Sequence, residues 1–159
     1  DEKNFPKETL DLKGDVCVDK VLGSAILFKK KDIEKIGFLD ENFFLYYEDD
    51  DLCRRVKKIN MSVIQIIDAK AQHIHGHSKV KNKLKRTFIR NYHFTYDELY
   101  YYFKNAKHYE KFNYLKKKIP NYLIKMILNF FIFRFNQSVY YFSKTMAFYR
   151  FTKFLKKSS

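Results

Sequence analysis

The decisive segment is Tyr46-Tyr47-Glu48-Asp49-Asp50-Asp51-Leu52-Cys53-Arg54-Arg55, in which four consecutive carboxylates precede a basic and apolar continuation. This order predicts a helix from about residue 50 to residue 59, because the free N–H groups and the dipole of a helix stabilise carboxylates at its N-terminus. Four adjacent negative charges also repel one another, so they require a compensating cation: a metal, a basic substrate group or the nearby arginines. Taken alone, the run fits either a capping cluster or an active site.

Further motifs accompany this segment in a fixed order. Upstream lie an apolar run with Gly23-Ser24 inside it and the motif Phe38-Leu39-Asp40-Glu41-Asn42-Phe43-Phe44. Downstream lie an apolar stretch over residues 62–67, Asp68-Ala69 and the segment His73-Ile74-His75-Gly76-His77-Ser78. Over residues 18–78 these motifs resemble the C-terminal half of the catalytic domain of family 2 glycosyltransferases, the rhamnosyltransferase-like group with a GT-A fold.

The resemblance implies an α/β fold class: a partial GT-A-type domain that lacks its N-terminal nucleotide-binding half and is followed by an α-helical tail. We accordingly expect strands near 18–28, 62–67 and 71–75, a helix near 30–36 and helices through most of 80–156. The family's Asp-x-Asp metal motif has no counterpart before residue 18, and the chain begins at Asp1 without an initiator Met. The sequence is therefore interpreted as a fragment that is inactive by itself.

The resemblance also assigns roles to individual residues. Asp49 falls on the catalytic base, which would take a proton from an acceptor hydroxyl as that oxygen attacks the anomeric carbon of a nucleotide sugar. Glu48 would orient Asp49 or the acceptor. The substrate-binding residues are expected to be Gly23, Ser24, Asp51 and Arg55, and the last two also fit a structural role that ties the helix to its surroundings. Asp50 departs from the family pattern and is interpreted as a solvated variation.

His73 is the candidate metal ligand. In related enzymes a histidine at this place helps to hold the divalent cation, Mn²⁺ or Mg²⁺, that neutralises the departing diphosphate. Two alternatives stay open: His73 is a surface or hydrogen-bonded side chain, or it joins His75 and His77 in a zinc site, since alternate residues of a strand face one side.

Charge divides the chain into two parts. Residues 1–78 carry a net charge of −2 and residues 79–159 a net charge of +16, out of a total of +14. We therefore predict two units, residues 1–78 as the catalytic half and residues 79–159 as a basic, aromatic helical tail. The longest uncharged stretches of the tail run to about nine residues, whereas a bilayer span needs about 20.

Basic residues alternate with Tyr, Phe, Ile and Leu at helical spacing in the tail, and Pro120 is expected to separate one helix from the next. This pattern favours helices that lie in the interface of an anionic membrane, with snorkelling lysines. The first alternative is a small helical bundle with an aromatic core. The second is a nucleic-acid-binding surface, which basic and stacking residues also fit, although no known nucleic-acid-binding module is present.

These inferences predict an inverting, metal-dependent glycosyltransferase that acts at the inner face of the cell membrane. Its partners would be a nucleotide-sugar donor and a lipid-linked or surface-glycan acceptor. The competing hypothesis is a non-catalytic basic module that binds membrane or nucleic acid.

Overall fold

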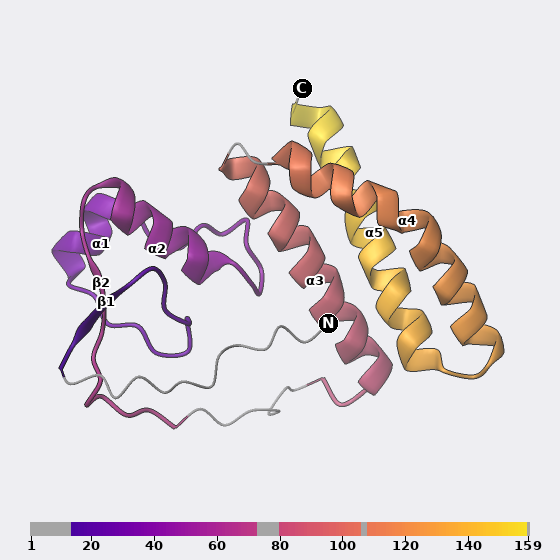
Figure 1. Ribbon diagram of the computed structural model, residues 1–159, viewed down its shortest axis with the longest axis horizontal. Helices are drawn as coiled ribbons and strands as arrows, with labels where there is room; N and C mark the ends of the chain where they lie inside the picture. Colours follow the sequence, from indigo (N-terminus) through magenta and orange to yellow (C-terminus); the bar gives the residue numbers. More distant parts are fainter. Residues whose placement is uncertain (1–13, 73–79, 106–107, 159) are drawn as a thin grey trace.

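The computed structural model describes residues 14–72, 80–105 and 108–158. In these residues the chain is mostly helical, with five helices and two short strands (Figure 1). In chain order the elements are β1 (Val16–Val18), α1 (Lys30–Ile36), α2 (Glu48–Lys58), β2 (Val63–Gln65), α3 (Lys83–Lys104), α4 (His108–Phe131) and α5 (Phe135–Ser158). None of the described helices is both long enough and apolar enough to cross a membrane.

The predicted α/β fold of GT-A type is wrong. β1 and β2 form a two-stranded antiparallel ladder in which Cys17 lies opposite Ile64, and the described residues contain no further strand. The apolar run after residue 20, expected to be a strand, forms turns and coil, and Leu22 and Leu27 are exposed. A strand needs a neighbour to pair its N–H and C=O groups, and the described part of the chain offers only β2 to β1.

The helix predictions in the first half are confirmed. α1 covers residues 30–36 as expected and is followed by Gly37, whose positive φ of 87° is accessible to glycine at little cost. α2 begins at Glu48, two residues before the expected start, so that all four carboxylates lie in its first turn. The residue before it, Tyr47, has a φ of 69°, which is uncommon for a side chain of this size.

The second half is a bundle of three helices, in which α5 packs against both α3 and α4. Leu99, Leu115 and Phe151 form its buried core, and around them pack Tyr96, Tyr100, Phe103, Phe112, Phe148, Phe154 and Leu155. The alternative of an aromatic helical bundle therefore holds for this core. The prediction that Pro120 separates one helix from the next is wrong. α4 continues through Pro120. Pro120 is exposed, so water can bond the carbonyl that the proline leaves without a donor.

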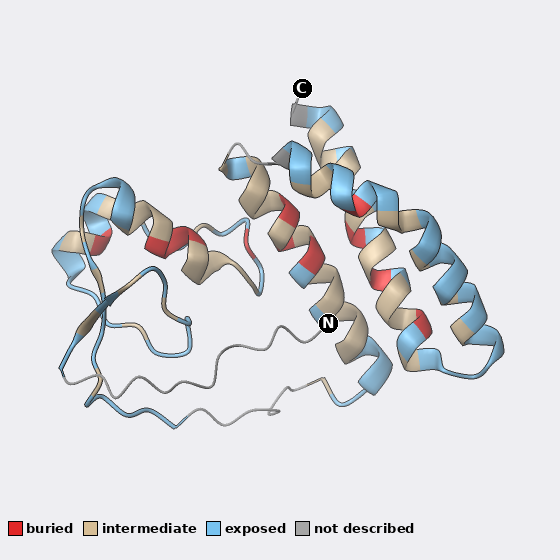
Figure 2. Cartoon of the chain, in the orientation of Figure 1, coloured by how far each residue is buried: buried red, intermediate tan, exposed pale blue. Residues whose placement is uncertain are grey.

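The segment between α1 and α2 contacts α3. The rings of Phe43 and Tyr100 meet edge to face, with centroids 5.0 Å apart, and Tyr46 packs against Phe94 at 5.3 Å. Figure 2 shows buried residues in α2, in this connecting segment and in the middle of α3. The segment that leads into α2 is therefore packed against α3 of the bundle.

Candidate active site

The carboxylate of Asp49 lies at the first turn of α2 and points to a segment 26 residues earlier. Its Oδ2 accepts a hydrogen bond from the N–H of Gly23 at 2.7 Å, and its Oδ1 accepts one from the N–H of Asp50 at 2.8 Å. A Cβ atom on Gly23 would lie 3.4 Å from both Cβ and Oδ2 of Asp49. The structure thus brings together Gly23 and Asp49, two residues that the sequence assigned to one site. Ser24 follows as an exposed residue.

Asp51 lies on the opposite side of the turn and is buried, with 1% of its surface exposed. Its carboxylate accepts hydrogen bonds from Nε of Arg55 at 2.8 Å and from Nζ of Lys104 at 2.9 Å. Two cations therefore offset the cost of burying this charge.

The guanidinium of Arg55 continues from Asp51 to the end of α1. It donates to the backbone carbonyls of Ile36 at 2.9 Å, Gly37 at 2.6 Å and Phe38 at 2.8 Å. In the described structure Asp51 and Arg55 are thus occupied by internal contacts that fasten α2 to α1. Their predicted contact with substrate stays a prediction.

Lys104, from the last turn of α3, joins the two halves of the chain. Its ammonium lies 2.8 Å from Oδ2 of Asp40, which also accepts a hydrogen bond from the hydroxyl of Tyr100 at 3.2 Å. Burial alone would raise the pKa of Asp40, but the hydrogen bonds from Lys104 and Asn42 outweigh it and lower the pKa to about 2. Asp40 belongs to the motif of residues 38–44, but the sequence gives no sign that its partner is Lys104 in α3.

A second carboxylate of α3, Asp97, holds the chain that enters α2. It is fully buried, and its Oδ2 accepts the N–H groups of Leu45 and Tyr46, each at 3.2 Å. Burial raises the pKa of Asp97 to about 6, although these backbone hydrogen bonds favour the ionised form. Sequence reasoning missed Asp97, because a carboxylate in a polar and aromatic helix gives no sign that it is buried.

The aromatic approach to α2 packs on the same helix. The ring of Tyr47 lies between Phe94 and Tyr101, with centroid distances of 5.7 and 5.4 Å. Burial, followed by the nearby carboxylate of Glu98, raises the pKa of the Tyr47 phenol. The unusual backbone of Tyr47 is therefore stabilised by ring packing that α3 supplies.

Two further charges surround Asp49. Lys20 lies 3.0 Å from Asp50, and this hydrogen bond, with a smaller contribution from the charge of Asp49, raises the pKa of Lys20. Asp50 therefore has a partner, which its interpretation as a solvated variation did not anticipate. Glu48 has a buried Oε2 that finds no hydrogen-bond partner within the described residues.

The predicted metal site cannot be located in the described structure. His73, together with His75 and His77, lies outside the described residues. Among the described residues, no three His, Cys, Asp or Glu side chains converge as metal ligands do. The carboxylates of α2 instead contact the N–H of Gly23 and the cations Lys20, Arg55 and Lys104. The described residues alone therefore do not fit a resident divalent cation.

Comparison with known proteins gives one partial similarity. Over 54 residues the chain is 39% identical to the low-salt glycan biosynthesis hexosyltransferase Agl10 of Haloferax volcanii. The aligned segment is 33% of this chain and spans only 18% of the length of that relative. No family model and no solved structure matches the chain. A third of the chain is thus similar to a hexosyltransferase.

Proposed function

We propose that this chain is part of an inverting glycosyltransferase of family 2 type in which Asp49 is the catalytic base. The observation that carries the proposal is the placement of Asp49. Its half-buried carboxylate lies in the first turn of α2, and the N–H of Gly23 fixes one of its oxygens at 2.7 Å. The similarity of part of the chain to a hexosyltransferase supports the reaction class.

In this proposal Asp49 takes the proton of an acceptor hydroxyl while that oxygen forms a bond to the anomeric carbon of the donor. The bond from the anomeric carbon to the diphosphate oxygen breaks in the same step, and the nucleoside diphosphate leaves with the electron pair. Attack from the face opposite the leaving group inverts the anomeric centre, so a single base is sufficient and no glycosyl-enzyme intermediate forms.

The surroundings of Asp49 suit a positioned base. The N–H of Gly23 and the first turn of α2 hold the carboxylate in one orientation, which reduces the loss of freedom on reaching the transition state. The buried Oε2 of Glu48 is an acceptor without a donor among the described residues, and a hydroxyl of the acceptor sugar would supply that donor. We therefore propose that Glu48 orients the acceptor beside Asp49.

The substrates in this proposal are a nucleotide sugar and a lipid-linked or surface-glycan acceptor. A divalent cation, held in part by His73, remains a prediction of the family resemblance. The groups proposed to act on the acceptor, the base Asp49 and the orienting Glu48, are side chains of this chain.

The stereochemistry of the product tests this reaction. The full-length protein would be supplied with a panel of nucleotide sugars and with glycan acceptors, and the configuration of each new linkage would be determined by proton NMR. We expect transfer with inversion at the anomeric carbon. Retention of configuration would remove the one-base mechanism. An absence of transfer from every donor, with the tail still bound to lipid or nucleic acid, would favour the non-catalytic basic module.

A further inference from the structure

The last turns of α4 have their apolar face in solvent. Leu123, Ile124, Ile127, Leu128 and Phe131 are all exposed, and their recurrence at intervals of three and four residues places them along one side of the helix. In a water-soluble bundle this face would ordinarily turn toward the core. Contiguous apolar surface of this kind marks a site of interaction.

The buried residues of α5 near this end are small instead, although the rings of Tyr122 in α4 and Tyr141 in α5 also meet, with centroids 5.7 Å apart. Ser138 is buried and its hydroxyl donates to the backbone carbonyl of Met126 at 2.9 Å, while Ser143 and Ala147 are completely buried further along α5. Helices that pack in an apolar solvent have this distribution, with small and hydroxyl-bearing residues inside and Leu, Ile and Phe outside. At the turn end of the α4–α5 pair, large apolar residues are therefore exposed and small residues are buried, the reverse of the arrangement in the aromatic core at the other end.

The turn between α4 and α5 also exposes a large apolar side chain. Phe133 has a φ of 57°, and the N–H of Arg134 closes the turn on the carbonyl of Asn129 at 2.8 Å. Glycine is the usual residue at this position, because a left-handed backbone costs a side chain about 1–2 kcal/mol. Phe133 is nevertheless 79% exposed, so its contacts within the described chain do not account for the presence of a phenylalanine here.

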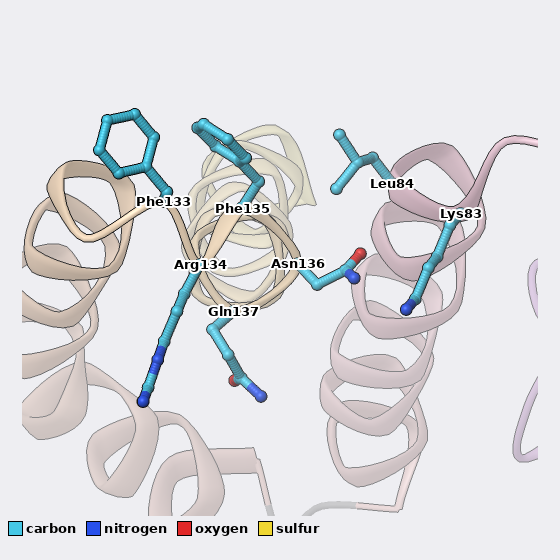
Figure 3. A pocket seen from close by; sticks show the side chains of 7 residues that line it. All are labelled: Lys83, Leu84, Phe133, Arg134, Phe135, Asn136 and Gln137. Atoms are coloured by element: carbon cyan, nitrogen blue, oxygen red, sulfur yellow. The ribbon is translucent and has the colours of Figure 1, made fainter.

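The residues around this turn divide by polarity. They line a shallow pocket of about 430 Å³ together with the first residues of α3. Figure 3 shows Leu84, Phe133 and Phe135 on one side, and the cationic ends of Lys83 and Arg134 directed to the other side. Apolar groups on one side and cations behind them match the depth profile of a bilayer, in which acyl chains lie beneath phosphates.

The charge of this region specifies the lipid. Residues 119–143, which include the turn, contain the cations Lys125 and Arg134 and no Asp or Glu, and Lys83 of α3 lines the same pocket. A protein partner that covered the apolar face would have to be acidic around its rim. An anionic bilayer supplies the apolar layer and the negative charge in one surface.

We propose that the α4–α5 turn docks on an anionic lipid bilayer. Phe131, Ile132 and Phe133 enter the interface, and Lys83 and Arg134 contact headgroup phosphates. This placement narrows the expected membrane contact from the whole tail to one end of the bundle. It is independent of the proposed transferase activity, because the docking residues lie outside the site around Asp49.

Co-sedimentation of the 159-residue chain with vesicles tests the proposal. Vesicles of phosphatidylglycerol mixed with phosphatidylcholine are compared with vesicles of phosphatidylcholine alone, at several salt concentrations. We expect binding to the anionic vesicles, weakened by salt but incompletely, because buried apolar area is not screened. Phe133→Gly should weaken binding about tenfold, the equivalent of removing most of one buried ring.

Phe133→Gly removes the ring without disturbing the fold, because glycine suits the left-handed turn. The variant should be as stable as the parent or more stable. Leu27→Ser is the matched control, since Leu27 is 92% exposed but lies in the first half of the chain. It should bind like the parent. Unchanged vesicle affinity of Phe133→Gly, or no vesicle binding by the parent, overturns the proposal.

Two other occupants of the face are distinguished in the same samples. Tighter retention on single-stranded nucleic acid than on vesicles at matched salt overturns the lipid assignment. A dimer in sedimentation equilibrium that Phe133→Gly dissociates, without a change in vesicle binding, assigns the face to a second copy of the chain and also overturns it.

Discussion

Lys104 of α3 places its ammonium 2.9 Å from the buried carboxylate of Asp51 in α2, 53 residues earlier in the chain. The same ammonium contacts Asp40 at 2.8 Å. Through these two contacts the C-terminal bundle fixes the helix whose first turn carries Asp49. The geometry of the candidate site therefore depends on residues that lie outside the motifs quoted for it.

Lys104→Met should lower the free energy of unfolding by about 1.5–3 kcal/mol. The substitution keeps an unbranched apolar stem but removes a charged hydrogen-bond donor from Asp51, which is then left with Arg55 alone. Urea denaturation measures the change. Lys30→Met is the control, because Lys30 pairs with Glu34 at 4.0 Å on an exposed face. That variant should stay within about 0.5 kcal/mol of the parent, and equal effects of the two variants would contradict the role of Lys104.

The pH dependence of stability should reveal Asp97. Its pKa of about 6 in the folded chain exceeds the value of about 3.9 for an unfolded chain, so the folded state binds the proton more tightly. The contribution of Asp97 to stability is therefore present at low pH and is lost as pH rises from about 4 to about 6.

Asp97→Asn isolates this contribution, since other groups also titrate in that range. The stability of the parent relative to Asp97→Asn should fall between pH 4 and pH 6 and be constant above it, as measured by urea denaturation at each pH. A difference that does not vary across this range would show that the folded and unfolded states bind this proton equally, and would contradict the raised pKa of Asp97.

Gly23→Val should reduce transfer by the full-length protein about 100-fold. A Cβ atom at this position already lies 3.4 Å from Asp49, so the added methyl groups would displace the carboxylate, and displacements of about 1 Å have effects of this size. The thermal midpoint should change little because Gly23 is exposed. Gly23→Ala fits at ordinary contact distance and should stay within a few-fold of the parent. Full activity of Gly23→Val would separate Gly23 from the site.

His73→Ala tests the predicted cation. If His73 helps to hold a metal against the donor diphosphate, the variant should need more Mn²⁺ or Mg²⁺ for half-maximal transfer and bind the donor more weakly. Titration calorimetry with the nucleotide sugar, at several metal concentrations, measures both effects. Unchanged metal response and donor affinity would leave His73 without this role.

Much of the local structure followed from the sequence, but the tertiary structure did not. The acidic run and the arginines after it located α2 to within two residues, because helix ends impose local rules on charge. The α/β class came from the family resemblance and failed, since residues 21–28 have no described strand with which to pair. The contacts of Asp97 and Lys104 join residues more than 50 positions apart, and no periodicity encodes such pairs.

The candidate site was predicted in part, because the order of the motifs along the sequence was informative. Gly23 and Asp49 were assigned to one site by motif order, and a hydrogen bond between them is present. Which part of the tail exposes its apolar residues was not foreseen. Leu, Ile and Phe at helical spacing fit a membrane-interfacial helix or a bundle core, and only the packing against α5 shows that this face of α4 points outward.

The most direct test of the central claim compares Asp49→Asn with Asp50→Asn in the full-length protein. The two variants remove one carboxylate each from adjacent positions of α2, and the rate of sugar transfer is measured at saturating donor and acceptor. Asp49→Asn should lower kcat by about 10²–10⁴-fold, because the amide keeps the shape of the side chain and loses the base. Asp50→Asn should stay within a few-fold of the parent, since Asp50 pairs with Lys20. Transfer by Asp49→Asn at the rate of the parent would contradict the assignment of Asp49 as the base.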